Sequence, residues 1–148
     1  MIYFIGAGPG AADLITVRGA EILRRADRVI YAGSLVNPEL LDYCPEGCDK
    51  LNSASMTLEE VMEAMCACPA EQTVVRLHTG DPSIYGAIRE QMDELDRRSM
   101  AYEIVPGVMF DASVQRLAVA PELWESPPGY FAGCSGRDVP YVPFRCGG

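Results

Sequence analysis

The sequence predicts an α/β fold, a mainly parallel sheet with helices on both faces, followed by an irregular C-terminal tail. Short apolar runs alternate with helical patterns over the first two thirds of the 148 residues. Glycine turns directly follow several of these runs. From Pro121 onward, prolines and glycines recur without a helical or strand period. We therefore expect an α/β domain over residues 1–120 and an irregular tail, rich in proline and glycine, over residues 121–148.

Four apolar runs account for the predicted strands. They cover residues 1–5, 28–32, 73–77 and 101–105. Each run is short and rich in β-branched or aromatic residues, as in strands that are buried on both faces. Because helical segments separate these runs, the strands are expected to be parallel, so that their carboxyl ends share one edge of the sheet.

Capping residues mark where the helices begin. Thr16 precedes the first helical pattern, and Asn37 precedes a short second one. Thr57 and Glu60 have the spacing of a capping box. Asp81 stands before a long helical pattern with proline at its first position. The predicted helices cover residues 16–25, 38–41, 57–67, 82–98 and 111–117.

Charge and hydropathy exclude several classes of protein. The formal net charge is −9, whereas a protein that neutralises nucleic-acid phosphates carries the opposite sign. No apolar run approaches the roughly 20 residues that a membrane span needs. The first residues also lack the basic start of a signal peptide. We therefore expect a cytoplasmic protein that binds neither nucleic acid nor a membrane.

The six cysteines do not predict a metal site. Cys44 and Cys48 are separated by three residues and Cys66 and Cys68 by one, whereas structural zinc knuckles typically have two. His78 is the single histidine, so a second imidazole ligand is missing. In a cytosolic chain, thiols are expected rather than disulfides. We expect no bound metal.

The first glycine loop, residues 6–11, leaves two interpretations open. It follows a strand and fits the dinucleotide-binding pattern, which would indicate a nucleotide-dependent oxidoreductase. Pro9 argues against this class, because proline removes one of the backbone N–H groups that such a loop donates to pyrophosphate. Residues 32–34, at the end of the second strand, also lack the carboxylate that binds a ribose. The other interpretation is a tight turn without a ligand.

Two more glycine turns are predicted at the same edge. Residues 76–86 run from a strand end directly into a helix, where open parallel sheets bind ligands. Gly80 would let a ligand approach the backbone closely. Asp81 could cap the helix or direct its charge at the ligand. Gly107 follows the last strand, so that three glycine turns at one edge predict a ligand pocket there.

Together, these motifs resemble the tetrapyrrole (corrin/porphyrin) methylase family. The matching segments follow the family's order over residues 1 to about 108: GAGPG at 6–10, DLITVRG at 13–19, AD at 26–27, GDP at 80–82 and PGV at 106–108. Residues 29–36, 52–60 and 76–86 are similar to one branch, the precorrin-4 and cobalt-precorrin-4 C11-methyltransferases. The resemblance implies S-adenosylmethionine-dependent C-methylation of a corrin precursor in cobalamin biosynthesis.

The resemblance also implies which residues form the site. Positions that line the S-adenosylmethionine pocket in the family correspond here to Pro9, Thr79, Gly80, Asp81, Ile84, Met109 and Phe110. We expect the tetrapyrrole substrate to contact Gly8, Gly10, Arg18, Arg76 and Tyr85, of which the arginines would meet the carboxylates that the macrocycle carries. Met109 and Phe110 depart from the small or hydroxyl residues that are usual there. Asp81 would hold the cofactor's ammonium group or only cap the helix.

The implied mechanism requires no nucleophilic side chain, because an electron-rich ring carbon attacks the methyl group. Family members have a second α/β domain, with the cofactor in the cleft between the two, and the full-length form is expected to be a homodimer. In this chain the family pattern fades after about residue 117, so we expect the second domain to be missing or disrupted. A truncated, non-catalytic module that binds a tetrapyrrole or a partner protein is therefore an alternative.

Overall fold

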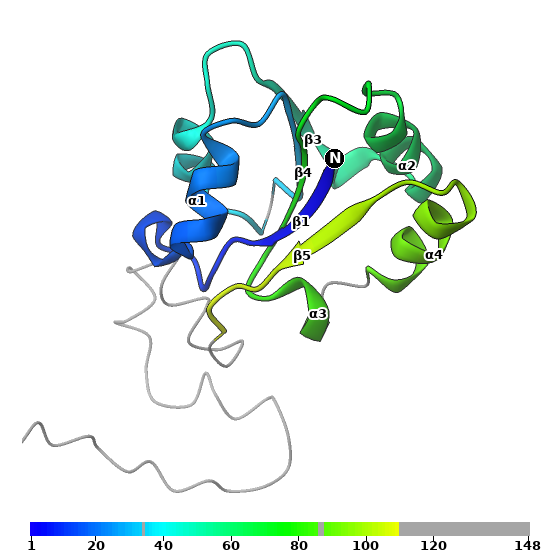
Figure 1. The fold of residues 1–148 in the computed structure, drawn as a ribbon. Helices are drawn as coiled ribbons and strands as arrows, with labels where there is room; N and C mark the ends of the chain where they lie inside the picture. Colours follow the sequence, from blue (N-terminus) through cyan, green and yellow to red (C-terminus); the bar gives the residue numbers. More distant parts are fainter. Residues whose placement is uncertain (34, 86–87, 110–148) are drawn as a thin grey trace, which may run out of the picture.

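The computed structural model describes residues 1–33, 35–85 and 88–109, apart from the side chain of Tyr85. Five parallel strands form one sheet in the order β3-β2-β4-β1-β5 (Figure 1). The strands are β1 (Ile2–Gly6), β2 (Arg28–Tyr31), β3 (Asp49–Asn52), β4 (Val74–His78) and β5 (Tyr102–Val105). Four of them coincide with predicted strands to within a residue. The predicted α/β fold with a parallel sheet is confirmed.

Helices cover both faces of this sheet (Figure 1). One face packs against α1 (Val17–Leu23) and the 3₁₀ helix η2 (Pro38–Tyr43), and the other against α2 (Leu58–Cys66) and α4 (Arg89–Arg97). Three short elements follow the carboxyl ends of β1, β3 and β4. They are the 3₁₀ turns η1 (Ala12–Leu14) and η3 (Ser53–Ser55) and the helix α3 (Pro82–Tyr85).

The predicted helix starts are confirmed by the capping bonds. Thr16 Oγ1 accepts a hydrogen bond from Gly19 N at 3.2 Å, at the start of α1. Thr57 and Glu60 form a reciprocal capping box, with distances of 2.7 Å and 3.2 Å, at the start of α2. Asn37 caps η2 in the same way. These bonds span only a few residues, which is why the sequence alone reveals them.

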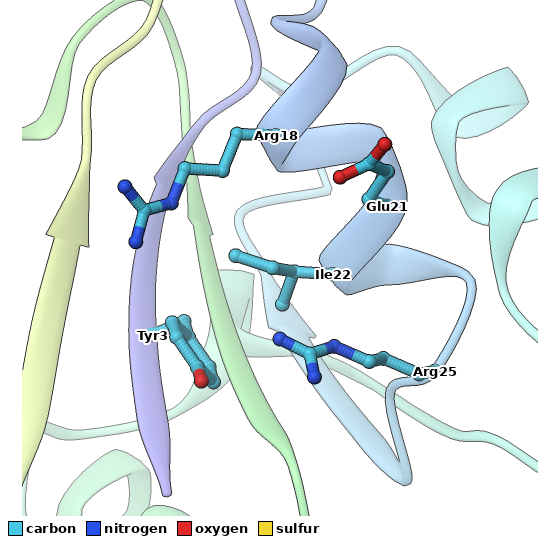
Figure 2. Close-up of a pocket in the computed structure, with 5 residues that line it drawn as sticks. All are labelled: Tyr3, Arg18, Glu21, Ile22 and Arg25. Atoms are coloured by element: carbon cyan, nitrogen blue, oxygen red, sulfur yellow. The ribbon is translucent and has the colours of Figure 1, made fainter.

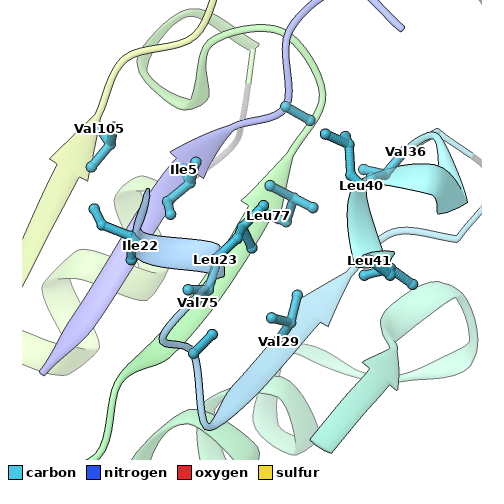
Figure 3. Packing of buried hydrophobic residues seen from close by; sticks show 12 residues of the cluster. Ile5, Ile22, Leu23, Val29, Val36, Leu40, Leu41, Val75, Leu77 and Val105 are labelled. Atoms are coloured by element: carbon cyan, nitrogen blue, oxygen red, sulfur yellow. The ribbon is translucent and has the colours of Figure 1, made fainter. Parts of the chain in front are cut away.

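The strands β1, β2, β4 and β5 send alternate side chains into the two cores. Ile22 projects from α1 toward the sheet (Figure 2) and packs with Val75 and Leu77 of β4 (Figure 3). On the other face, Phe4 and Leu95 are fully buried. Burial of one such side chain stabilises the fold by about 1.5–3 kcal/mol. The apolar cores therefore fix the sheet and, with it, the position of the turns at its carboxyl edge.

Two secondary-structure predictions were wrong. The strand β3 was not predicted because its residues are mostly polar, and it lies at the sheet edge with only Leu51 partly buried. The helix predicted over 82–98 is divided into α3 and α4, with Ile88 as the N-cap residue of α4. Gly86, a poor helix former, lies between the two, in residues 86–87, outside the described part of the chain. The predicted helix over 111–117 and the tail over 121–148 also lie outside the described residues.

Candidate functional site

The turns after β1 and β4 pair with each other at the carboxyl edge of the sheet. Gly80 N donates a hydrogen bond to Gly8 O at 2.9 Å, and Gly8 N donates to Gly80 O at 3.3 Å. Gly8 and Gly80 have φ angles of 79° and 62°, a region that residues with a Cβ rarely adopt. The prediction that these two turns share one edge is therefore confirmed.

The turn after β5 packs directly against this pair. A Cβ on Gly107 would lie 1.9 Å from Gly80 O, and a Cβ on Gly6 would lie 2.4 Å from Gly107 Cα. Only glycine can fill these positions without displacing backbone. The three predicted glycine turns thus meet, and at these positions the glycines allow backbone to approach backbone.

Asp81 connects two of the turns through both of its carboxylate oxygens. Oδ1 accepts hydrogen bonds from Ser83 Oγ and from Ser83 N, the latter at 2.8 Å, and so caps the first turn of α3. Oδ2 accepts a hydrogen bond from Gly107 N at 3.0 Å. Burial by itself would raise the pKa of Asp81, but the hydrogen bonds from Ser83 and Gly107 hold the pKa below its usual value. The ionised carboxylate therefore has a structural function, whatever else it binds.

Large apolar side chains are exposed around these turns. An exposed fraction of 38% to 75% is shared by Leu14, Val17, Leu35, Ile84 and Val108. All five follow the carboxyl ends of β1, β2, β4 and β5. A sixth exposed side chain, Leu58, lies apart from the turns in the groove between α2 and α4. Apolar surface gathered in this way is typical of a binding site for a ligand or for another part of a protein.

The residues predicted to bind the cofactor lie around this junction. Thr79 Oγ1 donates to Leu35 O at 3.1 Å, and Asp81 N donates to Met109 Sδ at 3.0 Å. Ile84 is 59% exposed on α3, whereas Pro9 is buried in the loop after β1. Gly80 is part of the junction itself. Phe110 lies outside the described residues.

The predicted substrate residues are not gathered in one place. Gly8 and Gly10 are buried in the loop after β1. Arg18 forms an ion pair with Glu103 and borders a hollow of about 400 Å³ between α1 and the sheet, on the sheet face rather than at its edge (Figure 2). The side chain of Tyr85 is outside the described part of the structure. The substrate contacts of these residues stay predictions.

Arg76 and His78 project from β4 into the core beneath α2 and α4. Each is 9% exposed. Burial lowers the pKa of Arg76 to about 10, so the guanidinium remains charged at neutral pH. Burial, together with the nearby Arg76 charge, lowers the pKa of His78 to about 3, so the imidazole is neutral. Arg76 Nη1 donates to Ile30 O at 3.2 Å and to Ser53 Oγ at 3.1 Å, inside the domain.

Sequence reasoning missed three residues near this edge: Leu35, Asn52 and Ser53. Their segments, residues 29–36 and 52–60, served only to indicate a branch of the family. The available signal was the Asn-Ser pair at the end of a polar segment, because such residues commonly bond nearby backbone groups. In the structure, both side chains bond the backbone that leaves β2.

Two kinds of feature are absent from residues 1–33, 35–85 and 88–109, the described part of the chain. No three His, Cys, Asp or Glu side chains in this part of the chain gather as a metal ion would require. None of its helices combines the length and the apolar character needed to cross a bilayer.

Comparison with known proteins identifies relatives of this chain. The cobalt-precorrin-4 C(11)-methyltransferase of Methanocaldococcus jannaschii is 52% identical over 108 residues, which are 72% of this chain and 42% of that protein. The precorrin-4 C(11)-methyltransferase of Mycobacterium tuberculosis strain H37Rv is 50% identical over 108 residues, which are 43% of its length. The chain therefore spans less than half the length of these relatives.

Solved structures agree with this relationship. A cobalt precorrin-4 methyltransferase of cobalamin biosynthesis has a TM-score of 0.71 and 49% identity, over 82% of this chain and 50% of that one. The uroporphyrin-III C-methyltransferase from Thermus thermophilus, solved with S-adenosylhomocysteine, has a TM-score of 0.61 and 32% identity, over 73% of this chain and 45% of that one. A family model described as Tetrapyrrole (Corrin/Porphyrin) Methylases matches residues 1–123. This chain belongs to that family, the tetrapyrrole methylases, which use S-adenosylmethionine as methyl donor.

Proposed function

We propose that this chain forms the N-terminal half of the cleft of a cytoplasmic C11-methyltransferase that acts on precorrin-4 or cobalt-precorrin-4 in cobalamin biosynthesis. Identities of 50% and 52% to relatives with these names support this branch. The uroporphyrinogen-III C-methyltransferase of Bacillus subtilis, from a sister branch, is 36% identical over 115 residues. The observation that carries the proposal is the carboxyl edge, where three glycine turns meet among exposed apolar side chains.

The described residues at this edge fit the chemistry of S-adenosylmethionine. When bound, this cofactor would supply a methyl group already activated by its sulfonium. The exposed Ile84 and Leu35 offer apolar surface to an adenosine. The carboxylate oxygens of Asp81 already accept hydrogen bonds from Ser83 and Gly107, so we expect the charge of Asp81 to contribute little to holding an ammonium group. We assign the cofactor site to Pro9, Thr79, Gly80, Asp81, Ile84, Met109 and Phe110.

The contribution of this chain to the reaction is mainly orientation. No nucleophilic side chain is required, because the attacking atom is a carbon of the substrate ring. Correct placement of two reacting groups can supply about 7–11 kcal/mol of the barrier reduction. Backbone turns that pack without intervening side chains, as Gly6, Gly80 and Gly107 do, form a rigid support for such placement.

The substrate side of the site is proposed from the same resemblance. Gly8 and Gly10 would let the macrocycle approach the backbone. Arg18 would contribute positive charge toward the substrate carboxylates, and Tyr85 an aromatic surface. Arg76, which is buried and bonded inside the domain, would act on the substrate side only indirectly. We expect the complete protein to act as a homodimer.

Binding of the cofactor can be tested with a matched pair of variants. Ile84→Glu places a charge on the exposed surface at the glycine turns, and Leu58→Glu places one on an exposed position of α2. Neither should change the free energy of unfolding by more than about 0.5 kcal/mol. We expect Ile84→Glu to weaken binding of S-adenosylhomocysteine at least tenfold in an NMR titration, and Leu58→Glu to leave it unchanged. Equal effects of the two variants, or tighter binding of NAD, would contradict the assignment.

Activity requires a complete cleft. We suggest joining this chain to the C-terminal half of the Methanocaldococcus jannaschii relative and supplying labelled S-adenosylmethionine with precorrin-4 or cobalt-precorrin-4. Transfer of label to C11 of either compound would support the proposal and identify the substrate. Binding of the tetrapyrrole without transfer would instead favour a non-catalytic binding module.

A further inference from the structure

Arg76 is a charged side chain buried in the central strand of the sheet. It is 9% exposed, and none of the ion pairs among the described residues includes it. Its Nε also lacks a hydrogen-bond partner in this part of the chain. A buried charge of this kind often makes a protein less stable than an apolar side chain of similar volume would. Packing therefore does not explain why an arginine occupies this position.

The guanidinium instead connects β4 to β2 and to the residue that follows β3. Arg76 Nη1 donates hydrogen bonds to Ile30 O at 3.2 Å and to Ser53 Oγ at 3.1 Å. Ser53 Oγ in turn donates to Tyr31 O at 3.1 Å. Because hydrogen bonds from a charged donor are stronger than neutral ones, Arg76 fixes the orientation of the Ser53 hydroxyl.

Asn52 bonds the same stretch of backbone at Gly33, two residues after Tyr31. Its Oδ1 accepts hydrogen bonds from Gly33 N at 3.1 Å and from Ala54 N at 3.0 Å. A Cβ on Gly33 would lie 2.2 Å from Asn52 Nδ2, so the side-chain amide packs directly on the backbone of Gly33. The chain that leaves β2 is therefore held at Tyr31 by Ser53 and at Gly33 by Asn52.

The backbone held in this way continues into residues 32–36, which we call the β2 turn; of these, residue 34 is outside the described residues. Leu35 N and Val36 N both donate to Ala32 O, at 3.0 Å and 3.1 Å. On the other side, Leu35 O accepts the hydrogen bond from Thr79 Oγ1. The turn is thus fixed between Asn52–Ser53 and Thr79, and the 61% exposed side chain of Leu35 lies at the carboxyl edge.

We propose that Arg76 is a positioning residue, which acts through Ser53 to hold the β2 turn so that Leu35 and Thr79 form one wall of the ligand site. The proposal rests on the proposed function, because it takes that site to be the one for S-adenosylmethionine. It assigns to Arg76 a function distinct from direct substrate contact, since its guanidinium is bonded inside the domain.

Amide hydrogen exchange, measured residue by residue by NMR on the 148-residue chain, tests whether Arg76 holds the turn. We expect Arg76→Met to raise exchange at Gly33, Leu35 and Val36 at least tenfold, with the amides of β1 unchanged. The matched control is Arg28→Met, which removes an arginine that bonds Ala64 O at the opposite end of β2. This control should leave the β2 turn within twofold of the original chain.

Ser53 provides a second pair of variants. They test whether the bonds through Ser53 hold the β2 turn, even if Arg76→Met does not fold. Ser53→Ala should loosen the β2 turn as Arg76→Met does, whereas Ser53→Thr keeps a hydroxyl and should restore protection. Exchange within twofold of the original chain in Ser53→Ala would overturn the proposal. A uniform rise that includes β1 and β5 would also overturn it, because it would indicate a general structural role.

A titration of the same samples with S-adenosylhomocysteine connects the turn to the site. We expect Arg76→Met to weaken binding at least fivefold while the amides of β1 keep their protection, so that the loss does not come from unfolding. Unchanged affinity in a chain with a loosened turn would show that the turn is not a wall of the site and would overturn that part of the proposal. If the chain gives no shifts with this probe even when joined to the C-terminal half of the Methanocaldococcus jannaschii relative, the proposed function fails, while the exchange rates still support or overturn the positioning role of Arg76.

Discussion

The sheet has an amino edge, where its parallel strands begin, and a carboxyl edge, where they end. The two edges use the same kind of hydrogen bond but differ in their glycines and in their exposed side chains. At the amino edge, Asp27 Oδ2 accepts from Thr73 N at 2.7 Å, and the amino group of Met1 donates to Gln72 O at 2.7 Å. At the carboxyl edge, Asp81 accepts from Ser83 and Gly107. In both places a polar group satisfies backbone at the end of a strand.

Of the two edges, only the carboxyl edge combines these hydrogen bonds with positive-φ glycines and exposed apolar side chains. Among the described residues, the glycines with positive φ are Gly8, Gly10 and Gly80, and all follow β1 or β4. Gly47, which precedes β3, has no atom within 4 Å of the position of a Cβ. The amino edge therefore only satisfies the backbone at the strand starts, whereas the carboxyl edge also has the close packing and the surface of a binding site.

The largest expected difference between the edges concerns a glycine from each. Gly107→Ala should lower the free energy of unfolding by about 3 kcal/mol or more, because its Cβ would meet the carbonyl oxygen of Gly80. Gly47→Ala should be neutral or stabilise the chain by up to about 1 kcal/mol, through the lower entropy of the unfolded state. Urea denaturation of both variants measures this difference. Similar losses in the two would remove the distinction between the edges.

The second prediction concerns His78, at the carboxyl end of β4. Because the pKa of His78 is lowered to about 3, against about 6.5 in the unfolded chain, protons bind mainly to the unfolded state as the pH falls. Its contribution to the stability should therefore decrease by about 1.4 kcal/mol per pH unit below pH 6.5, or about 2 kcal/mol by pH 5. The comparison is the pH dependence of unfolding for the original chain and for His78→Gln. Parallel curves would show that His78 is not buried as a neutral group.

A smaller difference separates the aspartates of the two edges. Asp81→Asn should cost about 1–2 kcal/mol, because asparagine offers one acceptor oxygen and cannot bond both Ser83 and Gly107. The Asp27 side chain accepts one hydrogen bond, so Asp27→Asn should change the stability by less than about 0.5 kcal/mol. Since the pKa of Asp81 is lowered, the advantage of aspartate should be present above about pH 4 and should be lost as the pH falls below it. A neutral Asp81→Asn variant at pH 7 would mean that the bond to Gly107 contributes little.

The smallest expected effect is that of Asp81→Asn on cofactor affinity. In the chain joined to the second half of a relative, calorimetry with S-adenosylhomocysteine should show a loss below threefold, under about 1 kcal/mol. The reason is that three donors already bond the carboxylate. A loss of tenfold or more, measured at a temperature where the variant is fully folded, would make Asp81 a direct ligand of the cofactor's ammonium group.

Much of the fold and part of the site follow from local patterns in the sequence. The caps at Thr16 and Thr57 involve residues three positions apart, and the apolar strands can be predicted from their composition. The shared edge of the glycine turns also follows, because parallel strands end on one side. The sequence left two roles open for Asp81, a helix cap and a ligand of the cofactor's ammonium group. The structure adds a third, the hydrogen bond from Gly107 N.

Other features depend on residues that are distant in sequence, so only the tertiary structure decides them. The polar strand β3 exists because it pairs with β2, with Leu51 opposite Ile30. Arg76 bonds groups 46 and 23 positions away, and for that reason its sequence neighbourhood alone suggested a substrate ligand. The sequence by itself thus determined which segments become strands, helices and turns at the carboxyl edge. The tertiary structure decided which polar groups meet, because buried hydrogen-bond partners are selected by the packing of the whole sheet.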